Sequence, residues 1–335
     1  MADNFANLKR ILKRRDWPLC LVTGLGRKVN RRCVRWLNFT GSHKFINRSQ
    51  GSDRLLLILA GYKSFLWPLT LTRIAEFAPP DMDVCVLSSG LYSEQLAEIA
   101  EAYGWSYLYT KLNKVPLVQN LAIAKYPKAK WIYKLDEDIF ISENFFEKLL
   151  EGYISVKNEG LYDPGFCSPL LNVNGYSYIS FLKTIHADDE YRAKFGELKH
   201  AVNEIKAFND GEAAKWLWKK SLPFDQVAQY IAAQPFKYST SPHRFSIGAI
   251  LFEREFWEKI GGFRTPLVEG GLGMDEEYLC KDCIEMSRVM VVIHNLFAGH
   301  FSFGPQASTM KDYLQEIYPQ LSIKKSEKEC ELTSL

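Results

Sequence analysis

The stretch Trp131-Ile-Tyr-Lys-Leu-Asp-Glu-Asp138 joins a short apolar run to three consecutive acidic residues. An apolar run of this length with polar residues after it predicts a buried strand over 131–135. Acidic residues that directly follow a strand lie at its carboxyl end, where open parallel sheets bind their ligands. We therefore predict that this segment supplies one strand of an α/β sheet and part of its functional site.

Apolar segments of strand length recur along the chain and alternate with segments of helical periodicity. Such alternation is typical of βαβ units, whose parallel strands are covered by helices. We therefore predict an α/β fold with a mixed, mainly parallel sheet, helices on both faces and a mostly helical insertion. The predicted strands are 55–60, 84–87, 105–109, 131–135, 245–252 and 289–293, and the first four are separated by predicted helices at 66–77, 93–103 and 116–126.

The alternation also suggests how the chain is divided. It lapses between the fourth and fifth predicted strands, where turns mix with helical pieces rich in aromatic and charged residues. We predict five segments: a basic arm at 1–52, one half of the α/β domain at 53–159, an insertion at 160–242, the other half at 243–310, and a C-terminal helix and tail at 311–335.

Composition excludes a disordered chain, because 47% of the 335 residues are apolar. Charge is unevenly spread, since residues 1–52 hold 12 Lys and Arg but only Asp3 and Asp16 as acids. No apolar run reaches the roughly 20 residues that cross a bilayer. The seven cysteines are too few and odd in number for a disulfide framework. We expect a cytoplasmic protein that lies peripherally at the inner face of the membrane.

The basic arm has three interpretations. Apolar residues recur at helical spacing near its start, with Lys and Arg between them, which is typical of helices that bind anionic membrane surfaces. We expect residues 1–40 to make such a contact, although the arm would also suit packing on its own domain. The third interpretation is a nucleic-acid-binding protein without catalysis. It is disfavoured because the remainder of the chain is net acidic, so no nucleic-acid partner is expected.

The acidic residues after 131–135 suggest a cation site. Asp136 and Asp138 alternate, which places both carboxylates on one side of the turn, and hard divalent ions prefer carboxylate oxygen. Neighbouring acids repel one another unless a cation neutralises them. The alternative is a solvated acidic turn before the next helix.

A second acidic group, Asp275-Glu276-Glu277, follows the flexible sequence Gly270-Gly-Leu-Gly-Met274. Acids are favoured at helix starts by the helix dipole, which is the structural interpretation. The functional interpretation makes Asp275 or Glu276 a general base, which needs access to a hydroxyl group and a suitable pKa.

Two histidines follow the last predicted strand. His300 stands in Gly299-His-Phe-Ser-Phe-Gly304, among small residues that permit close approach of a ligand. Its imidazole is a candidate to complete a metal site with Asp136 and Asp138. His294 is the second choice.

Four blocks together give the chain a family resemblance. They are Leu112-Asn-Lys-Val-Pro116 with Gln119-Asn-Leu-Ala-Ile-Ala124, then Ile132-Tyr-Lys-Leu-Asp-Glu-Asp138, then Gly248-Ala-Ile-Leu-Phe-Glu-Arg254 with Phe256 and Ile260-Gly-Gly-Phe263, and finally Asp275-Glu276 with Leu279-Cys280. In order and spacing they resemble the GT-A (Rossmann-like) glycosyltransferases, especially the inverting family-2 group with its DXD motif.

The resemblance implies an inverting transfer from a nucleotide-sugar, expected to be a UDP-sugar, to a hydroxyl of a glycan or lipid-linked acceptor, as in bacterial surface polysaccharide synthesis. It implies Mn²⁺ or Mg²⁺ at Asp136, Asp138 and His300, and a general base at Glu276 or Asp275. Residues 160–242 are expected to shape the acceptor pocket. The residues expected to contact the donor are Ala60, Tyr62, Ser88, Asn113, Asn120, Asp136 and Glu137.

The chain departs from the family pattern at two places. The acidic pair reads Asp275-Glu276 instead of Glu-Asp, which aligns Glu276 with the base and leaves Asp275 as an alternative. The first predicted strand ends in Ala60-Gly-Tyr-Lys63 instead of Tyr-Asn, which leaves base recognition open. The other enzyme class considered, a sugar nucleotidyltransferase, would need a Gly-rich phosphate loop at that position.

Overall fold

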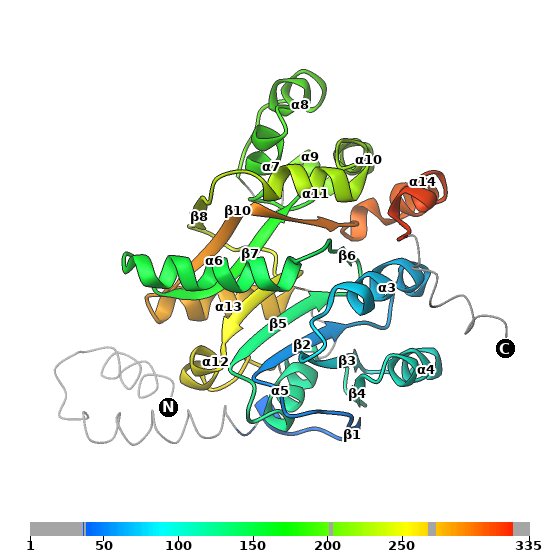
Figure 1. Cartoon of the computed structure of the whole chain (residues 1–335), viewed down its shortest axis with the longest axis vertical. Coiled ribbons are helices and arrows are strands. Elements are labelled where there is room, and N and C mark those ends of the chain that lie inside the picture. The colour runs from blue at the N-terminus through cyan, green and yellow to red at the C-terminus, as the bar shows by residue number, and fades with distance from the viewer. Residues whose placement is uncertain (1–35, 37, 201–203, 267–272, 324–335) are drawn as a thin grey trace, which may run out of the picture.

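The structure is a computed structural model that describes residues 36, 38–200, 204–266 and 273–323 (Figure 1). In these residues one ten-stranded sheet has the order β1-β4-β3-β2-β5-β9-β7-β10-β6, with β8 also paired to β10. The strands are β1 (His43–Ile46), β2 (Arg54–Leu59), β3 (Asp83–Ser89), β4 (Ser106–Thr110), β5 (Trp131–Asp136), β6 (Ile139–Phe140), β7 (Pro164–Leu171), β8 (Tyr238–Ser241), β9 (Ala249–Glu253) and β10 (Val289–His300).

Most of the longer strands run in one direction. β4, β3, β2 and β5 are mutually parallel, β9 is antiparallel to β5 and to β7, and β10 is parallel to β7. The carboxyl ends of β2, β3, β4, β5, β7 and β10 therefore meet at one edge of the sheet. The predicted mixed, mainly parallel α/β sheet is confirmed.

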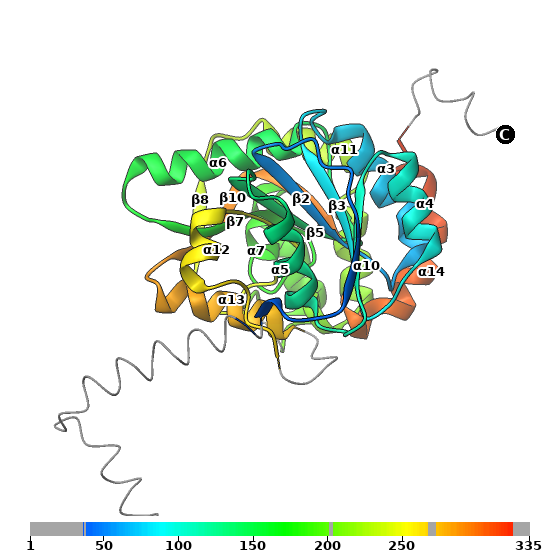
Figure 2. The same ribbon diagram turned by 90° about the horizontal axis from the view of Figure 1, so that it is seen from below.

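Helices cover both faces, as predicted. One buried apolar cluster joins β2, β3 and β5 to α3, α4 and α6, and another joins the opposite face to α5, α7, α12 and α13. Figure 2 shows α3 and α6 on one side of the strands and α12 and α13 on the other. The helices are α3 (Trp67–Phe77), α4 (Glu94–Ala102), α5 (Val115–Lys125), α6 (Phe145–Glu159), α7 (Tyr178–Thr184), α8 (Asp188–Phe195), α9 (Lys206–Asn209), α10 (Gly211–Lys220), α11 (Phe224–Ala232), α12 (Arg254–Ile260), α13 (Met274–Glu285) and α14 (Ala307–Leu321), with short 3₁₀ turns at Ser64–Leu66 and Gly304–Gln306.

Residues 160–242 are rich in helices but are not confined to the surface. They supply α7 to α11, and they also supply β7, which lies inside the sheet between β9 and β10. All but Tyr176 and Ser180 in the stretch 164–182 are buried. The segment expected to be an insertion therefore contributes a central strand.

Residues 1–35 of the predicted basic arm fall outside the described residues, as do Gly270, Gly271 and Leu272. None of the helices in the described ranges combines the length and apolar character needed to cross a membrane.

Candidate functional site

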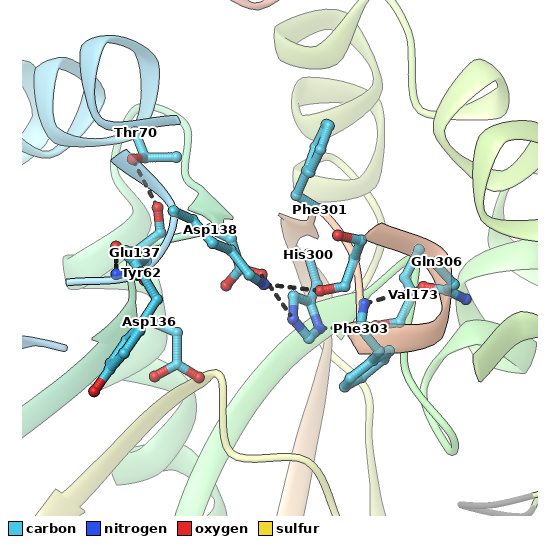
Figure 3. A network of polar contacts seen from close by, with 12 residues as sticks. Tyr62, Thr70, Asp136, Glu137, Asp138, Val173, His300, Phe301, Phe303 and Gln306 are labelled. Atoms are coloured by element: carbon cyan, nitrogen blue, oxygen red, sulfur yellow. Dashed lines mark hydrogen bonds and ion pairs between the residues drawn. The ribbon is translucent and has the colours of Figure 1, made fainter. Parts of the chain in front are cut away.

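The candidate site lies where strand ends meet at one edge of the sheet. Leu59 pairs with Asp136, so β2 and β5 end side by side. β6 turns back and pairs with the end of β10, which places His300 opposite Ile139, and the Phe301 N–H donates to the Asp138 carbonyl at 3.0 Å. This pairing brings segments about 160 residues apart in sequence into contact, and Figure 3 shows Asp138 directed toward His300.

Asp138 is a buried carboxylate with two basic neighbours. Its side chain is 3% exposed and accepts a hydrogen bond from Lys63 Nζ, and His300 Nε2 lies 3.4 Å from its Oδ2. Burial disfavours the charged carboxylate, but the charges of His300 and Lys63 outweigh it and hold the pKa of Asp138 below its ordinary value. Asp138 is therefore ionised throughout the physiological range and marks a point that attracts cations.

The His300 ring is held in a defined orientation. Its Nδ1 lies 3.0 Å from the Val173 carbonyl, and its backbone N–H donates to Asn172 Oδ1 at 2.9 Å. A carbonyl only accepts, so Nδ1 must carry the proton. The atom left facing Asp138 is Nε2, which is the arrangement that a metal-ligating histidine adopts.

Asp136 occupies a different environment from Asp138. Its Oδ1 lies 2.5 Å from Lys134 Nζ, which also donates to the Ile247 carbonyl at 2.9 Å. Burial raises the pKa of Asp136 to about 6, with Lys134 opposing the shift and the negative charges of Asp138 and Asp275 adding to it. In Figure 3 Asp136 points away from His300. Gly248 lies against this side chain, since an added Cβ would be 3.5 Å from Asp136 Oδ2.

Glu137, predicted to contact the donor, instead faces the interior of the protein. It is 6% exposed, and its carboxylate accepts hydrogen bonds from the Gly61 and Tyr62 N–H groups at 2.9 Å and from Trp67 Nε1 at 2.6 Å. Its backbone carbonyl accepts from Thr70 Oγ1 at 2.8 Å. The three consecutive acids thus have separate tasks, and Glu137 anchors the loop that follows β2.

Part of the predicted donor surface is assembled beside this loop. Tyr62 is 63% exposed, and its hydroxyl donates to the Ser89 carbonyl at 2.9 Å. Asn113 hydrogen-bonds to the Tyr62 side chain and lies against Gly90, where an added Cβ would be 2.5 Å from the Asn113 Cβ. Tyr62 and Asn113 therefore form an accessible polar surface at the ends of β2, β3 and β4.

Two other predicted donor contacts are buried within the same region. Ala60 is 2% exposed, and its N–H donates to the Leu87 carbonyl at 2.9 Å. Ser88 is fully buried, and its Oγ bonds the Leu91 carbonyl and the Tyr107 hydroxyl. Both residues therefore stabilise the strand ends that form the edge of the site.

Asn120 is a structural residue that lies within the core. It is fully buried, and its Nδ2 donates to the carbonyls of Asn38 at 3.0 Å and Phe263 at 2.7 Å. Its Oδ1 accepts from Trp257 Nε1 at 2.9 Å and from the Phe263 N–H at 2.8 Å. Every hydrogen-bonding group of this amide is satisfied within the protein, which leaves none for a donor nucleotide.

The carboxylates at the start of α13 differ in their availability. Glu276 Oε1 accepts from Arg244 Nε at 2.5 Å, and burial raises the Glu276 pKa although Arg244 opposes the shift. Asp275 forms no hydrogen bond or ion pair with any residue that the structure describes, and its negative charge contributes to the raised pKa of Asp136. Arg244 binds Glu276 and the Gly273 carbonyl, which holds the start of α13 beside the segment that leads into β9 and so near the end of β5. Asp275 is the carboxylate there without a partner among the described residues.

His294 lies away from this group. Its Nε2 bonds Ser239 Oγ at 2.8 Å, and its N–H donates to the Lys237 carbonyl at 2.8 Å, on the side of β10 that pairs with β8. Burial lowers the His294 pKa to about 4. This histidine is a neutral structural residue at physiological pH.

Sequence reasoning missed three basic residues of the site: Lys63, Lys134 and Arg244. Lys134 carried a signal, because a lysine inside an apolar strand needs a carboxylate partner and Asp136 stands two residues further on the same face. Lys63 and Arg244 carried no local signal, since their partners are distant in sequence.

The residues present fit a divalent cation in part. Among the described residues no group of three His, Cys, Asp or Glu side chains is placed to hold a metal ion. Asp138 and His300 nevertheless offer a carboxylate oxygen and an imidazole nitrogen 3.4 Å apart, and the Lys63 ammonium already lies against Asp138. The Lys63 ammonium thus occupies a position that a metal ion could take. With only two protein ligands, such a metal would complete its coordination with phosphate oxygens and water. Asp136, paired with Lys134, lies outside this pair of ligands.

Comparison with known proteins identifies structural neighbours only. No protein-family model and no curated protein matches the chain. Among solved structures it is similar to the mannosyltransferase PcManGT from Pyrobaculum calidifontis in complex with GDP-Man and Mn²⁺, with 12% identity and a TM-score of 0.43 over 91% of this chain and 74% of that one. It is also similar to S. aureus TarS 1–349, with 12% identity and a TM-score of 0.40 over 82% and 68% of the two chains. A longer TarS structure matches at 16% identity and a TM-score of 0.28 over 35% and 21%. These neighbours are glycosyltransferases.

Proposed function

We propose that this protein is a glycosyltransferase that moves a sugar from a nucleotide-sugar to a hydroxyl group of a glycan or lipid-linked acceptor. One observation carries the proposal: the ionised Asp138, the oriented His300 and the free carboxylate of Asp275 lie at the same edge of the sheet. This arrangement offers a cation-attracting point for a diphosphate and, separately, a base for an incoming hydroxyl.

The donor is proposed to lie across the ends of β2, β3 and β5. Tyr62 and Asn113 present the accessible polar surface that suits a nucleoside, and a UDP-sugar is the expected donor. Asp138 and His300 are the residues that would hold Mn²⁺ or Mg²⁺. When bound, this ion neutralises negative charge on the leaving nucleotide. Asp136 faces the same edge beside Gly248, where it suits a contact to a sugar or ribose hydroxyl.

We assign the general base to Asp275 in preference to Glu276. A base must reach the proton that it removes, and a carboxylate bound to a guanidinium is a poorer acceptor. Glu276 is bound to Arg244 at 2.5 Å, whereas Asp275 is free of such contacts among the described residues. Glu276 and Arg244 then hold the start of α13 in place. A base on the side of the sugar opposite the leaving diphosphate would invert the anomeric configuration in a single displacement.

A sugar nucleotidyltransferase is disfavoured by the loop after β2. That class would need free backbone N–H groups there to hold phosphates. The Gly61 and Tyr62 N–H groups are already bound to the Glu137 carboxylate. Contact of residues 1–40 with an anionic membrane and a role in bacterial surface polysaccharide synthesis are proposed together with this activity. Nucleic-acid binding is the disfavoured alternative, because the chain beyond residue 52 is net acidic.

The donor assignment is tested by thermal shift with UDP, GDP, UDP-glucose, UDP-N-acetylglucosamine and GDP-mannose, each with and without Mn²⁺. We expect a shift for one base that depends on Mn²⁺ and is lost in Asp138→Asn. The matched control is Asp189→Asn, which removes an exposed carboxylate on α8. The proposal fails if no nucleotide shifts the melting temperature of the unaltered protein.

The base is tested with the nucleotide-sugar that binds, by following its slow hydrolysis or its transfer to an added acceptor. Asp275→Asn is expected to keep donor binding and lower turnover by about 10²-fold or more. Glu276→Gln is expected to have a smaller effect. The opposite ranking would reassign the base to Glu276.

A further inference from the structure

Besides His300, Asp138 has a second basic neighbour among the described residues, Lys63. Its Nζ donates to Asp138 and to the Ser302 carbonyl, the latter at 3.0 Å. It thereby links the loop after β2 to the segment that follows β10. Lys63 is therefore an ammonium held between a carboxylate and a backbone carbonyl.

A divalent cation that binds Asp138 Oδ2 beside His300 Nε2 competes with this ammonium, because Lys63 Nζ contacts the same oxygen. Both would lie within a few ångströms of one carboxylate, where two positive charges repel strongly because water is largely excluded. A metal that binds Asp138 Oδ2 is therefore expected to displace Lys63. The displaced ammonium needs a new anionic partner nearby.

The loop allows this displacement without unfolding. The Glu137 carboxylate binds the N–H groups of Gly61 and Tyr62, so the backbone before Lys63 is anchored. The Lys63 side chain itself is 30% exposed and has a flexible four-carbon stem. The side chain can therefore swing toward the open edge of the sheet while the backbone stays in place.

We propose that Lys63 is a donor-binding residue with two positions: on Asp138 when the site is free, and on the diphosphate of the nucleotide-sugar when a divalent cation replaces it at Asp138. This inference rests on the proposed function for its second position only. It predicts effects of opposite sign, since Lys63 opposes the metal alone and supports the diphosphate once the metal is bound.

The first position is tested without any nucleotide. Mn²⁺ binding to the full chain is measured by electron paramagnetic resonance of the free ion. Lys63→Met is expected to tighten Mn²⁺ binding by about tenfold, because the competing charge is gone. Lys63→Arg should bind Mn²⁺ as weakly as the unaltered protein. Lys125→Met, on the exposed end of α5, is the matched control and should change nothing. Unchanged or weaker Mn²⁺ binding in Lys63→Met overturns the proposal, as does the absence of Mn²⁺ binding in every variant.

The second position is tested with UDP and GDP at saturating Mn²⁺. Lys63→Met is expected to bind the preferred nucleoside diphosphate about tenfold more weakly, a change opposite in sign to its effect on Mn²⁺. A residue that only stabilised the fold would not produce opposite signs. If Lys63→Met and the unaltered protein bind the nucleoside diphosphate equally well, the proposed contact of Lys63 with the diphosphate is wrong. If neither nucleotide binds the unaltered protein while Lys63→Met still tightens Mn²⁺, the proposed function fails and the competition at Asp138 stands.

Discussion

Replacing Glu137 with Gln should destabilise the protein although the two side chains have nearly the same shape. Glu137 Oε2 accepts from the Gly61 N–H and from Trp67 Nε1, and Oε1 accepts from the Tyr62 N–H. In the variant one oxygen becomes an NH₂ group that faces a donor, so one hydrogen bond is lost. The other two lose their charge assistance.

The expected magnitude follows from these three bonds. Hydrogen bonds to charged groups are worth about 1.5–3 kcal/mol and neutral ones about 0.5–1.5 kcal/mol. Losing one and weakening two gives a decrease of about 3 kcal/mol in the free energy of unfolding, after allowance for relaxation of the loop. Because the loop carries Tyr62 and Lys63, nucleotide binding should weaken as well.

The assay is equilibrium unfolding in urea, followed by circular dichroism. The matched control is Glu143→Gln, the same chemical change at an exposed position six residues further along the chain. A Glu137→Gln variant that is as stable as Glu143→Gln would refute the view that this carboxylate anchors the loop.

Three further changes test other parts of the structure. Burial raises the pKa of Asp282 to about 6 against the opposing charge of Arg264, so this carboxyl stabilises the fold when protonated and that stabilisation is lost as pH rises through about 6. The difference in the free energy of unfolding between Asp282→Asn and the unaltered protein, measured in urea, should therefore shift by about 2–3 kcal/mol in favour of the variant between pH 4 and pH 7.5. A difference that does not vary with pH would contradict this. Asn120→Asp places a carboxylate oxygen against two carbonyls and should cost about 3 kcal/mol or more; thermal melting beside exposed Asn47→Asp checks it, and equal melting temperatures would exclude a structural role. Gly299→Ala would bring a Cβ within 2.5 Å of Trp218 and should cost about 1–3 kcal/mol, whereas Gly304→Ala meets no atom within 4 Å and should be nearly neutral; similar urea midpoints for the two would count against tight packing there.

The half of the sheet from β2 to β5 was predictable because its signals are local. Continuous apolar runs separated by helical periodicity report burial on both faces, and the observed β2, β3, β4 and β5 lie within two residues of the predicted ranges. Asp136 and Asp138 could be placed at the ligand-binding edge for the same reason, since the end of a strand is read from the strand itself.

β7 could not be predicted from local sequence patterns. Pro164 begins the strand and Pro169 stands inside it, and proline removes a donor from the sheet, so the stretch does not look like a central strand. The structure accommodates Pro169 opposite Ile293, next to a shift in register where β10 bulges. That irregularity is a property of the pair of strands and cannot be read from either one.

What the sequence determined by itself is therefore the class of fold, the strands β2 to β5 with the helices between them, and the acidic edge at 136–138. Only the tertiary structure decided which charged groups meet there: Lys63 and His300 on Asp138, Lys134 on Asp136, Arg244 on Glu276, and the inward turn of Glu137. The physical reason is the distance along the chain between the residues that interact. Periodicity reflects the burial of residues that are close in sequence. These charge pairs instead join segments that are distant in sequence, and strand order and register determine which side chains meet.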